Sequence, residues 1–305
     1  MKKPSRRENV NPRLVTAAFT VTLATVLVVV GCRQKRTSQA PLSGKAVSRD
    51  GVAINYCVQG TGSLALVFVH GWSCDGSYWD QQLPYFSRRY KVVAVDLAGH
   101  GESGLDRKEW TIPAFGADVA AVVKQLDLKQ VVLIGHSMGG DVVTEAVQMI
   151  PDRVKALVLV DSFRRLDTNL TGRRLERYLA DFRADFQGRT DKMVRGIFGP
   201  ASDPELIEAT ARDMSSAPPE VAIACLEALN KWRSDRLREA LAVVTVPIIA
   251  INSDARGTDI AAFETAFSNF KFKFISNAGH FLMTEAPETF NKLLAETLNE
   301  LQTAK

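Results

Sequence analysis

One serine in this sequence has the neighbours that nucleophilic catalysis requires. Residues Gly135–Gly139 read Gly-His-Ser-Met-Gly, a G-x-S-x-G that follows the apolar run Val131–Ile134 and precedes a helical pattern over Asp141–Met149. Glycines two residues before and after the serine allow a strained strand-to-helix turn, in which neighbouring backbones approach closely. We therefore predict that Ser137 is a nucleophile for acyl chemistry rather than part of an ordinary tight turn.

A serine hydroxyl reacts only when a base removes its proton, and the usual base is histidine. The chain contains four histidines. His70 ends a predicted strand, His100 lies in a glycine-rich turn, and His136 adjoins the serine on a turn that directs its side chain elsewhere. His280 follows the last predicted strand and fits the chain order serine, acid, histidine, so we predict that it is the base.

The third group should be a carboxylate at the end of a strand, where it orients the imidazole. Asp254, two residues beyond the predicted strand over 248–252, is the preferred candidate. Asp161, which ends the run Ala-Leu-Val-Leu-Val-Asp, is the alternative. Asp259 is a third candidate, but it also suits the N-cap of the helix expected after it.

The elements that must position these residues alternate between short β-branched runs and helical patterns, which predicts an α/β fold with a mostly parallel twisted sheet. Several strands are almost continuously apolar, as expected when helices cover both faces. The predicted strands are Val52–Gln59, Leu64–His70, Tyr90–Asp96, Val131–Gly135, Val154–Asp161, Val246–Asn252 and Phe270–Ile275, and the predicted helices outside the insertion are Ile112–Leu126, Ser137–Met149, Asp259–Phe267 and Pro287–Leu301.

Residues 162–245 interrupt this alternation, because they contain no convincing strand and several helical patterns rich in Arg and Glu. We expect a helical cap above the site. Its arginines fit either a solvated, charge-balanced helix face or a face for anionic lipid headgroups. Its apolar residues fit either an acyl pocket or helix–sheet packing; they are Phe163, Leu166, Leu170, Leu179, Phe182, Phe186, Met193, Ile197 and Phe198.

Composition excludes several classes of protein. With 305 residues, 46% hydrophobic and 24% charged, the chain has the composition of an ordinary globular protein. The formal net charge of +4 is carried entirely by residues 1–31, so no nucleic-acid partner is expected. Four cysteines, without a C-x-x-C pair, are too few for a disulfide framework. No phosphate loop, metal cluster or haem motif is visible, and we expect no cofactor and no metal.

The first 31 residues have the layout of a secretory signal, with a basic start and the apolar run Leu14–Val30. The run ends at Gly31-Cys32, which resembles a bacterial lipobox and implies a signal peptide over 1–31 and lipidation of Cys32. We expect a polar tether over 32–43, a catalytic domain over 44–305, and a location in the bacterial cell envelope, anchored by lipid and facing away from the cytoplasm. The alternative is an uncleaved transmembrane anchor.

From about Gly44 to Leu301 the sequence resembles the α/β-hydrolase fold superfamily, in its esterase, lipase and peroxidase-like branch. The resemblance rests on the segments VFVHGW (67–72), DLAGHGES (96–103), GHSMGG (135–140), the Asp254 turn and NAGHF (277–281). It implies that the peptide N–H groups of Trp72 and Met138 form the oxyanion hole. Relatives usually carry a glycine shortly before the acid after the seventh strand, and Ile251–Asp254 lacks it.

These residues together predict a membrane-tethered serine hydrolase that cleaves a small or medium carboxylic ester. A serine at position 137 excludes the carboxylate nucleophile of dehalogenases and epoxide hydrolases. The same triad also suits a lactonase, thioesterase, carbon–carbon bond hydrolase, amidase, acyltransferase or perhydrolase. A non-catalytic binding protein of the envelope is the rival from another class, although binding alone does not require nucleophile, base and acid together.

Overall fold

The computed structural model describes residues 41–303 apart from 168–169. The chain divides into two units, residues 1–36 and 37–305, and all described residues belong to the second. The expectations for Leu14–Val30 and Cys32 therefore lie outside the described residues. Within the described ranges, no helix combines the length and the apolar character needed to span a bilayer.

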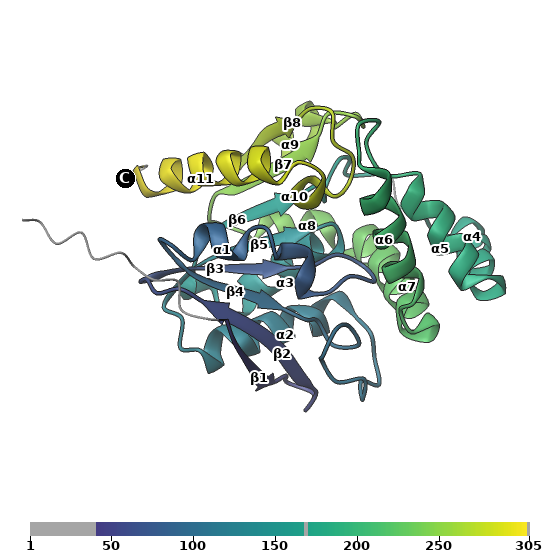
Figure 1. Cartoon of the computed structure of the whole chain (residues 1–305), viewed down its shortest axis with the longest axis horizontal. Helices are drawn as coiled ribbons and strands as arrows, with labels where there is room; N and C mark the ends of the chain where they lie inside the picture. Colours follow the sequence, from purple (N-terminus) through teal and green to yellow (C-terminus); the bar gives the residue numbers. More distant parts are fainter. Residues whose placement is uncertain (1–40, 168–169, 304–305) are drawn as a thin grey trace, which may run out of the picture. The chain divides into compact units, whose positions relative to one another are not determined.

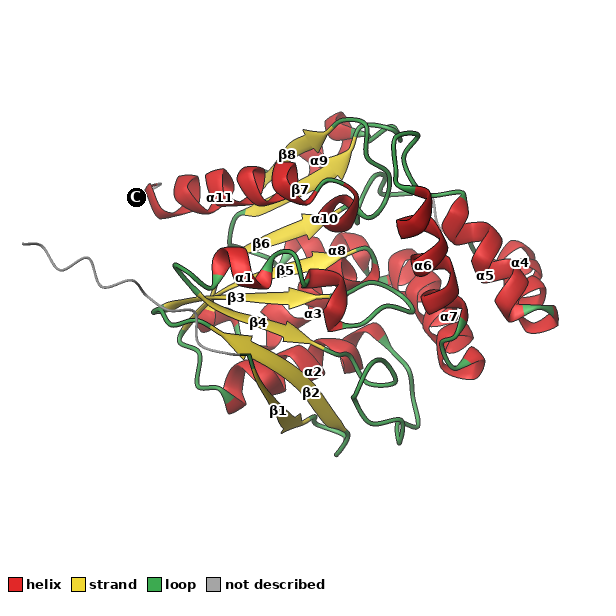
Figure 2. Ribbon diagram, viewed as in Figure 1, coloured by secondary structure: helices red, strands yellow, loops and turns green. Residues whose placement is uncertain are grey.

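The strands of the described chain form one eight-stranded sheet in the order β1-β2-β4-β3-β5-β6-β7-β8 (Figures 1 and 2). β2 pairs antiparallel with β1 and β4, and the other neighbouring pairs are parallel. The predicted α/β class with a mostly parallel sheet is confirmed. The strands are β1 (Leu42–Val47), β2 (Ala53–Gln59), β3 (Leu64–Val69), β4 (Lys91–Val95), β5 (Gln130–His136), β6 (Val154–Val160), β7 (Ile248–Ser253) and β8 (Phe270–Ile275).

Helices cover both faces of this sheet (Figure 2). The central strands are apolar along almost their whole length, and residues 65–69 of β3 are at most 1% exposed. Strands of this kind lose their contact with water only when helices lie on both sides. Outside the cap the helices are α1 (Leu83–Phe86), α2 (Ile112–Gln125), α3 (Met138–Met149), α9 (Ile260–Ala266), α10 (Leu282–Glu285) and α11 (Pro287–Thr303), with short 3₁₀ turns η1 (Gly76–Trp79) and η2 (Pro151–Arg153).

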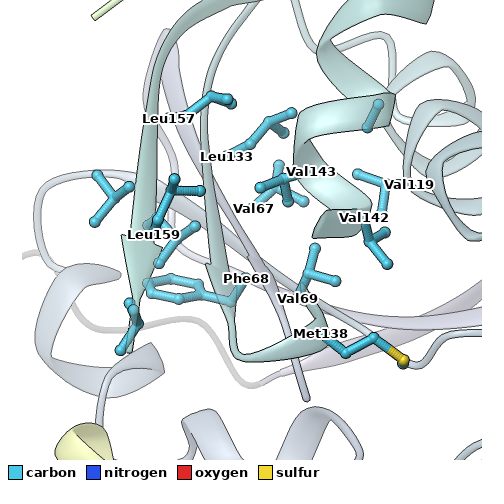
Figure 3. Packing of buried hydrophobic residues seen from close by; sticks show 14 of the residues in the cluster. Val67, Phe68, Val69, Val119, Leu133, Met138, Val142, Val143, Leu157 and Leu159 are labelled. Atoms are coloured by element: carbon cyan, nitrogen blue, oxygen red, sulfur yellow. The ribbon is translucent and has the colours of Figure 1, made fainter. Parts of the chain in front are cut away.

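Helix α3 fixes the end of β5 relative to the neighbouring strands. Its residues Val142 and Val143 are fully buried; Val143 lies toward Val67 and Leu133 of the sheet, and Val142 lies beside Val119 of α2 (Figure 3). Burying side chains of this size contributes roughly 1.5–3 kcal/mol each relative to exposure. The turn between β5 and α3 is therefore held from both sides by well-packed elements.

Parallel pairing brings the carboxyl ends of the central strands to one edge. Val69 of β3 lies opposite Gly135 of β5, and Val160 of β6 lies opposite both His136 of β5 and Ile251 of β7. Loops that follow adjacent parallel strands at equal height emerge side by side. The segments carrying the oxyanion loop, the predicted nucleophile and both candidate acids are therefore neighbours.

The insertion over 162–245 is helical, as predicted, and lies at the same edge. Figure 1 shows α4, α5, α6 and α7 gathered beyond the arrowheads of the central strands. α8 ends the insertion and packs against α3 and α7. The cap helices are α4 (Gly172–Ala184), α5 (Phe186–Arg195), α6 (Pro204–Ser215), α7 (Pro219–Asp235) and α8 (Leu237–Ala242).

β1 was not predicted, and it begins inside the segment expected to be a tether over 32–43. Leu42 and Val47 are exposed, and Ala46 is the only fully buried residue of the strand. Such a strand has no apolar alternation for a pattern to detect. It forms because β2 offers a complete antiparallel partner from Leu42 to Val47.

A buried ion pair anchors the segment between β4 and α2. Arg107 donates to both oxygens of Asp118, at 3.0 and 2.5 Å, and neither side chain is exposed. Asp118 also accepts from the Ser48 hydroxyl at 2.5 Å and from the peptide N–H of Ala98 at 3.2 Å. Asp50 accepts from Nε of Arg107 at 2.7 Å, so the guanidinium joins the hairpin after β1 to helix α2.

Replacing Arg107 by Met is expected to lower the free energy of unfolding by about 3–5 kcal/mol, because it leaves a buried, uncompensated Asp118 carboxylate. Urea unfolding followed by circular dichroism measures this. The matched control is Lys129→Met, which breaks the exposed pair between Lys129 and Asp127 and should leave the midpoint unchanged. Equal midpoints for both variants would show that the Arg107 network does not stabilise the fold.

Candidate active site

Ser137 lies at a strained turn between β5 and α3. Its backbone angles are φ 51° and ψ −118°, a combination that L-residues with a Cβ rarely adopt. The turn follows a buried strand and starts a helix, which is the strand–turn–helix setting predicted from the motif. Such a turn presents the side chain at the strand edge instead of burying it between sheet and helix.

The two glycines of the motif are needed for space. A Cβ on Gly135 would lie 2.2 Å from the carbonyl oxygen of Gly139, and a Cβ on Gly139 would lie 2.5 Å from the carbonyl oxygen of Val69. Contacts this short with backbone atoms cannot be relieved by rotating a side chain. The spacing G-x-S-x-G is therefore the condition for the β5–α3 turn to pack against β3.

The loop after β3 lies directly beside the serine. A Cβ on Gly71 would be 3.2 Å from Cβ of Ser137, and Trp72 is the next residue. Within the described chain, the peptide N–H groups of Trp72 and Met138 make no hydrogen bond. Two free N–H donors on either side of a serine are what an oxyanion hole requires.

His70 holds this loop in place. Its Nε2 accepts from the peptide N–H of Leu97 at 3.0 Å, so Nδ1 carries the proton and donates to the carbonyl oxygen of Gly71 at 2.8 Å. Burial lowers the pKa of His70, which keeps the ring neutral. The neutral form supplies the one donor and the one acceptor that these two contacts need.

The predicted base, His280, lies in the loop between β8 and α10. Its Nδ1 is 2.7 Å from Oδ2 of Asp161, and a carboxylate partner assigns the proton to Nδ1. Nε2 is then the unprotonated atom that can accept a proton. The ring packs against that of His136, with centroids 4.7 Å apart. Among the described residues Ser137 Oγ makes no hydrogen bond. In enzymes without bound substrate, the distance between a nucleophile and its general base is often long.

The structure places Asp161, the alternative acid, against His280, and it does not place the preferred candidate Asp254 there. Asp254 is exposed, and its carboxylate accepts from the Ser276 hydroxyl at 2.5 Å. The physical reason is the path of the chain after β7: the peptide N–H of Asp254 bonds the carbonyl oxygen of Ile275 at 3.2 Å, which carries the residue along β8 and away from the base. Asp259 caps α9 through Ala262, so the structure brings only the alternative acid to His280.

Asp161 is a fully buried carboxylate at the end of β6. Its Oδ1 accepts from the peptide N–H of Ser253 at 2.9 Å and from the guanidinium of Arg164. Burial by itself would raise the pKa of Asp161, but the hydrogen bond from His280 and the charges of His280 and Arg164 outweigh it, and the pKa is lowered. The acid is therefore ionised at neutral pH, as an orienting carboxylate must be.

Glu285 clamps the loop that carries the base, and no motif in the sequence pointed to it. One carboxylate oxygen accepts from the peptide N–H of Phe281 at 2.7 Å, and the other accepts from Gly279 at 2.7 Å. The second oxygen also accepts from the Gly199 N–H at 2.9 Å and from the Ser202 hydroxyl at 2.5 Å in the cap. The peptides on both sides of His280 are thereby tied to the connection between α5 and α6.

His136 links the nucleophile turn to the same loop. Its Nε2 donates to the carbonyl oxygen of His280 at 2.9 Å, and Nδ1 has no partner among the described residues. Burial and the nearby His280 lower the pKa of His136 to about 3, so the ring is neutral. It therefore links the nucleophile turn to the His280 loop as a neutral hydrogen-bond donor.

The cap places aromatic side chains over the oxyanion loop. The ring of Trp72 lies 5.7 Å from that of Phe182 and 6.2 Å from that of Phe186, centroid to centroid, and its Nε1 donates to the carbonyl oxygen of Ala222 at 2.7 Å. Phe198 packs on Phe281 at 5.0 Å. Of the apolar cap residues considered for an acyl pocket, Phe182, Phe186 and Phe198 pack their rings against aromatic side chains of the site loops.

Cys74, Arg183 and Arg189 make ordinary packing and ion-pair contacts in the described chain. Cys74 is buried, its Sγ donates to the carbonyl oxygen of Trp72 at 3.3 Å, and burial raises its pKa well above the usual value. Arg183 faces Glu176 and Glu227, and Arg189 lies over the Phe182 ring. These contacts fit a charge-balanced helix face.

Several known proteins share parts of this sequence. Residues aligned over 148 positions are 38% identical to a non-heme chloroperoxidase of Streptomyces lividans, covering 46% of this chain and 53% of that protein. A pimeloyl-[acyl-carrier protein] methyl ester esterase of Methylococcus capsulatus is 26% identical over 192 residues, 61% of this chain and 74% of that protein. The chain thus spans about half the length of the chloroperoxidase and three quarters of the esterase.

The solved structure of a thermophilic esterase from Thermogutta terrifontis superposes with a TM-score of 0.75 at 26% identity, covering 86% of this chain and all of that one. A family model described as alpha/beta hydrolase fold matches residues 65–287, from β3 to the start of α11. Together with the architecture described above, this match shows that the chain belongs to the α/β-hydrolase fold family.

Proposed function

We propose that this protein is a serine hydrolase that cleaves a small or medium carboxylic ester through an acyl-enzyme, with Ser137 as nucleophile, His280 as base and Asp161 as acid. The observation that carries the proposal is the 2.7 Å contact between His280 and a buried carboxylate, beside a strained serine turn. A structural histidine has no need of an ionised partner that is fully buried, because burying a charge is costly unless it serves a specific pairing.

Each group has a defined step. His280 Nε2 takes the proton of Ser137 Oγ as this oxygen attacks the carbonyl carbon, and the negative charge that develops on the carbonyl oxygen is bound by the N–H groups of Trp72 and Met138. The tetrahedral intermediate collapses, and the proton on His280 passes to the departing alkoxide. A water molecule then repeats the sequence on the acyl-enzyme, which releases the acid and restores Ser137.

Two features support an ester over other acyl groups. Both the thermophilic esterase and the methyl ester esterase that resemble this chain are named for ester substrates. The serine nucleophile also excludes an aspartyl ester intermediate. The aromatic groups of Phe182 and Phe186 over the oxyanion loop fit an apolar acyl or alcohol part beside the scissile carbonyl.

A second candidate is perhydrolysis, which the resemblance to a non-heme chloroperoxidase favours. In this reaction hydrogen peroxide replaces water in attacking the acyl-enzyme, and the products are a peroxyacid and free Ser137. The first half of the reaction is unchanged. Comparing acid and peroxyacid yields from p-nitrophenyl acetate with and without peroxide separates the two candidates.

Replacing Ser137 by Ala is expected to reduce kcat on short p-nitrophenyl esters by about 10⁵–10⁶, as in other serine triads. It should also abolish labelling by a fluorophosphonate probe. The matched control is Ser77→Ala, which removes an exposed hydroxyl in η1. Wild-type turnover and labelling in the Ser137 variant would show that another residue is the nucleophile.

Replacing Asp161 by Asn should cut kcat by about 10⁴, because an amide favours the wrong imidazole tautomer. Asp254→Asn is the matched control: it removes an exposed carboxylate bound to Ser276 and should change kcat less than about twofold. Steady-state kinetics with circular dichroism of both variants measures this ranking. The opposite ranking would return the role of acid to Asp254.

We also propose a lipid anchor at Cys32, supported by the apolar run that ends at Gly31-Cys32. A single acyl chain gives marginal membrane binding, and stable anchoring takes more than one. The intact mass of protein extracted from membranes should correspond to a chain that begins at Cys32 with added acyl mass. The Cys32→Ser variant should be released from the membrane or remain an unprocessed precursor. An unmodified wild-type chain that still carries Met1 would overturn the proposal.

A further inference from the structure

Arg164 is the one cation in contact with the catalytic carboxylate, among the described residues, that the proposed reaction does not use. It lies three residues after Asp161, on the segment that leads from β6 into the cap. Its guanidinium donates to Oδ1 of Asp161 and, on the other side, to the carbonyl oxygens of Ser253 and Arg256 in the loop after β7. The side chain is 15% exposed, so water screens this charge only partly.

The two oxygens of Asp161 are thereby divided between two partners. Oδ2 faces Nδ1 of His280 at 2.7 Å, and Oδ1 faces Arg164 and the peptide N–H of Ser253. When His280 takes the proton of the serine, one carboxylate lies between two positive groups. Arg164 then has opposing effects: it holds the acid beside the imidazole, and its fixed charge opposes protonation of the ring.

The other charged groups around His280 are accounted for without Arg164. His136, whose ring packs on it, is neutral because burial lowers its pKa to about 3. Glu285 binds the flanking peptide N–H groups and cap residues. Asp254 is exposed and bonded to Ser276. None of these contacts involves the Arg164 side chain.

We propose that Arg164 is a positioning residue that holds Asp161 against His280 and sets the pH range over which His280 acts as the base. The proposal rests on the proposed triad and deepens it. This role differs from a purely structural one. If Arg164 only connected the cap entry to the loop after β7, its replacement would affect stability and the maximal rate but would not move the pH dependence.

The direction of the effect follows from charge. Without the Arg164 cation, His280 is the only group that can balance the negative charge of Asp161 with a positive charge. The carboxylate then stabilises the imidazolium more strongly, so His280 stays protonated up to a higher pH. The rate, which needs unprotonated Nε2, then begins to rise at a higher pH. A nearby charge moves a titration by about one to three pH units when it is poorly screened. Arg164 has the same sign of charge as the imidazolium and is partly screened, so we expect its removal to move the midpoint by about one pH unit.

The experiment measures the second-order rate constant for labelling of Ser137 by a small fluorophosphonate from pH 4.5 to 9. This rate reports the base in the free enzyme and does not require the natural substrate. In Arg164→Gln the midpoint of the acidic limb of the pH–rate profile should move up by about one pH unit. At pH values below this midpoint the labelling rate should be roughly tenfold lower than in wild type. In Arg164→Lys, which keeps the charge, the midpoint should stay within about 0.3 units of wild type.

Arg165→Gln is the matched control, because Arg165 is the next residue, is 53% exposed and pairs only with Asp167 in the described chain. Its profile should coincide with that of wild type. If circular dichroism shows that Arg164→Gln is unfolded, Arg164→Met takes its place, since it keeps the apolar stem and removes the same charge. The expected shift is the same.

A folded Arg164→Gln or Arg164→Met whose limb stays at the wild-type midpoint would overturn the proposal, as would an equal shift in Arg164→Lys or Arg165→Gln. These outcomes leave the triad itself intact. Failure of the proposed function looks different: either wild-type Ser137 is not labelled at any pH, or Asp161→Asn labels at the wild-type rate with an unchanged limb.

Discussion

The buried negative charge of Asp161 is the constraint around which the rest of the site is arranged. A carboxylate without exposure is costly unless hydrogen bonds and positive groups compensate it. Here the compensation comes from three directions: the peptide N–H of Ser253 from β7, the guanidinium of Arg164 from the cap entry, and the imidazole of His280 from the loop after β8. The same contacts that make the charge tolerable also bring the base to the carboxyl edge of the sheet.

The cap is joined to the catalytic loops by polar contacts as well as by apolar packing. The peptide N–H of His280 donates to the carbonyl oxygen of Ile197 at 2.9 Å, and Glu285 binds Gly199. A Cβ on Gly279 would lie 2.3 Å from the backbone nitrogen of Gly199, so the two chains touch with no room for a side chain. Arg233 of α7 forms a partly buried bidentate pair with Asp141 in the first turn of α3. The base loop and the nucleophile helix are thus both attached to the cap.

The sequence was sufficient for the groups whose setting is local. Ser137 could be predicted because the G-x-S-x-G motif is itself the steric requirement of its turn, and His280 because it follows the last strand in the expected order. β1 escaped prediction because an edge strand with exposed side chains has no apolar period. Glu285 escaped because its role arises from four donors on two separate segments, which no spacing along the chain reveals.

The acid shows where local pattern stops being informative. β6 and β7 are adjacent parallel strands with Val160 opposite Ile251, so residues just beyond either end are at similar height, and strand order alone does not decide between Asp161 and Asp254. The decision depends on the direction of the backbone after each strand. After β7 the chain continues along β8 and carries Asp254 to the surface, whereas Asp161 occupies a left-handed turn with φ 45° that directs it inward.

Taking the acid from β6 has a structural consequence for the cap. Asp161 is followed at once by the cap entry, and Arg164 in that entry contacts both the acid and the loop after β7. The carbonyl oxygen of Arg164 also accepts from the peptide N–H of Asp259 at 2.8 Å, just before α9. The first residues of the insertion are therefore part of the support of the triad. A change in the path of the cap entry would therefore change the environment of Asp161 directly.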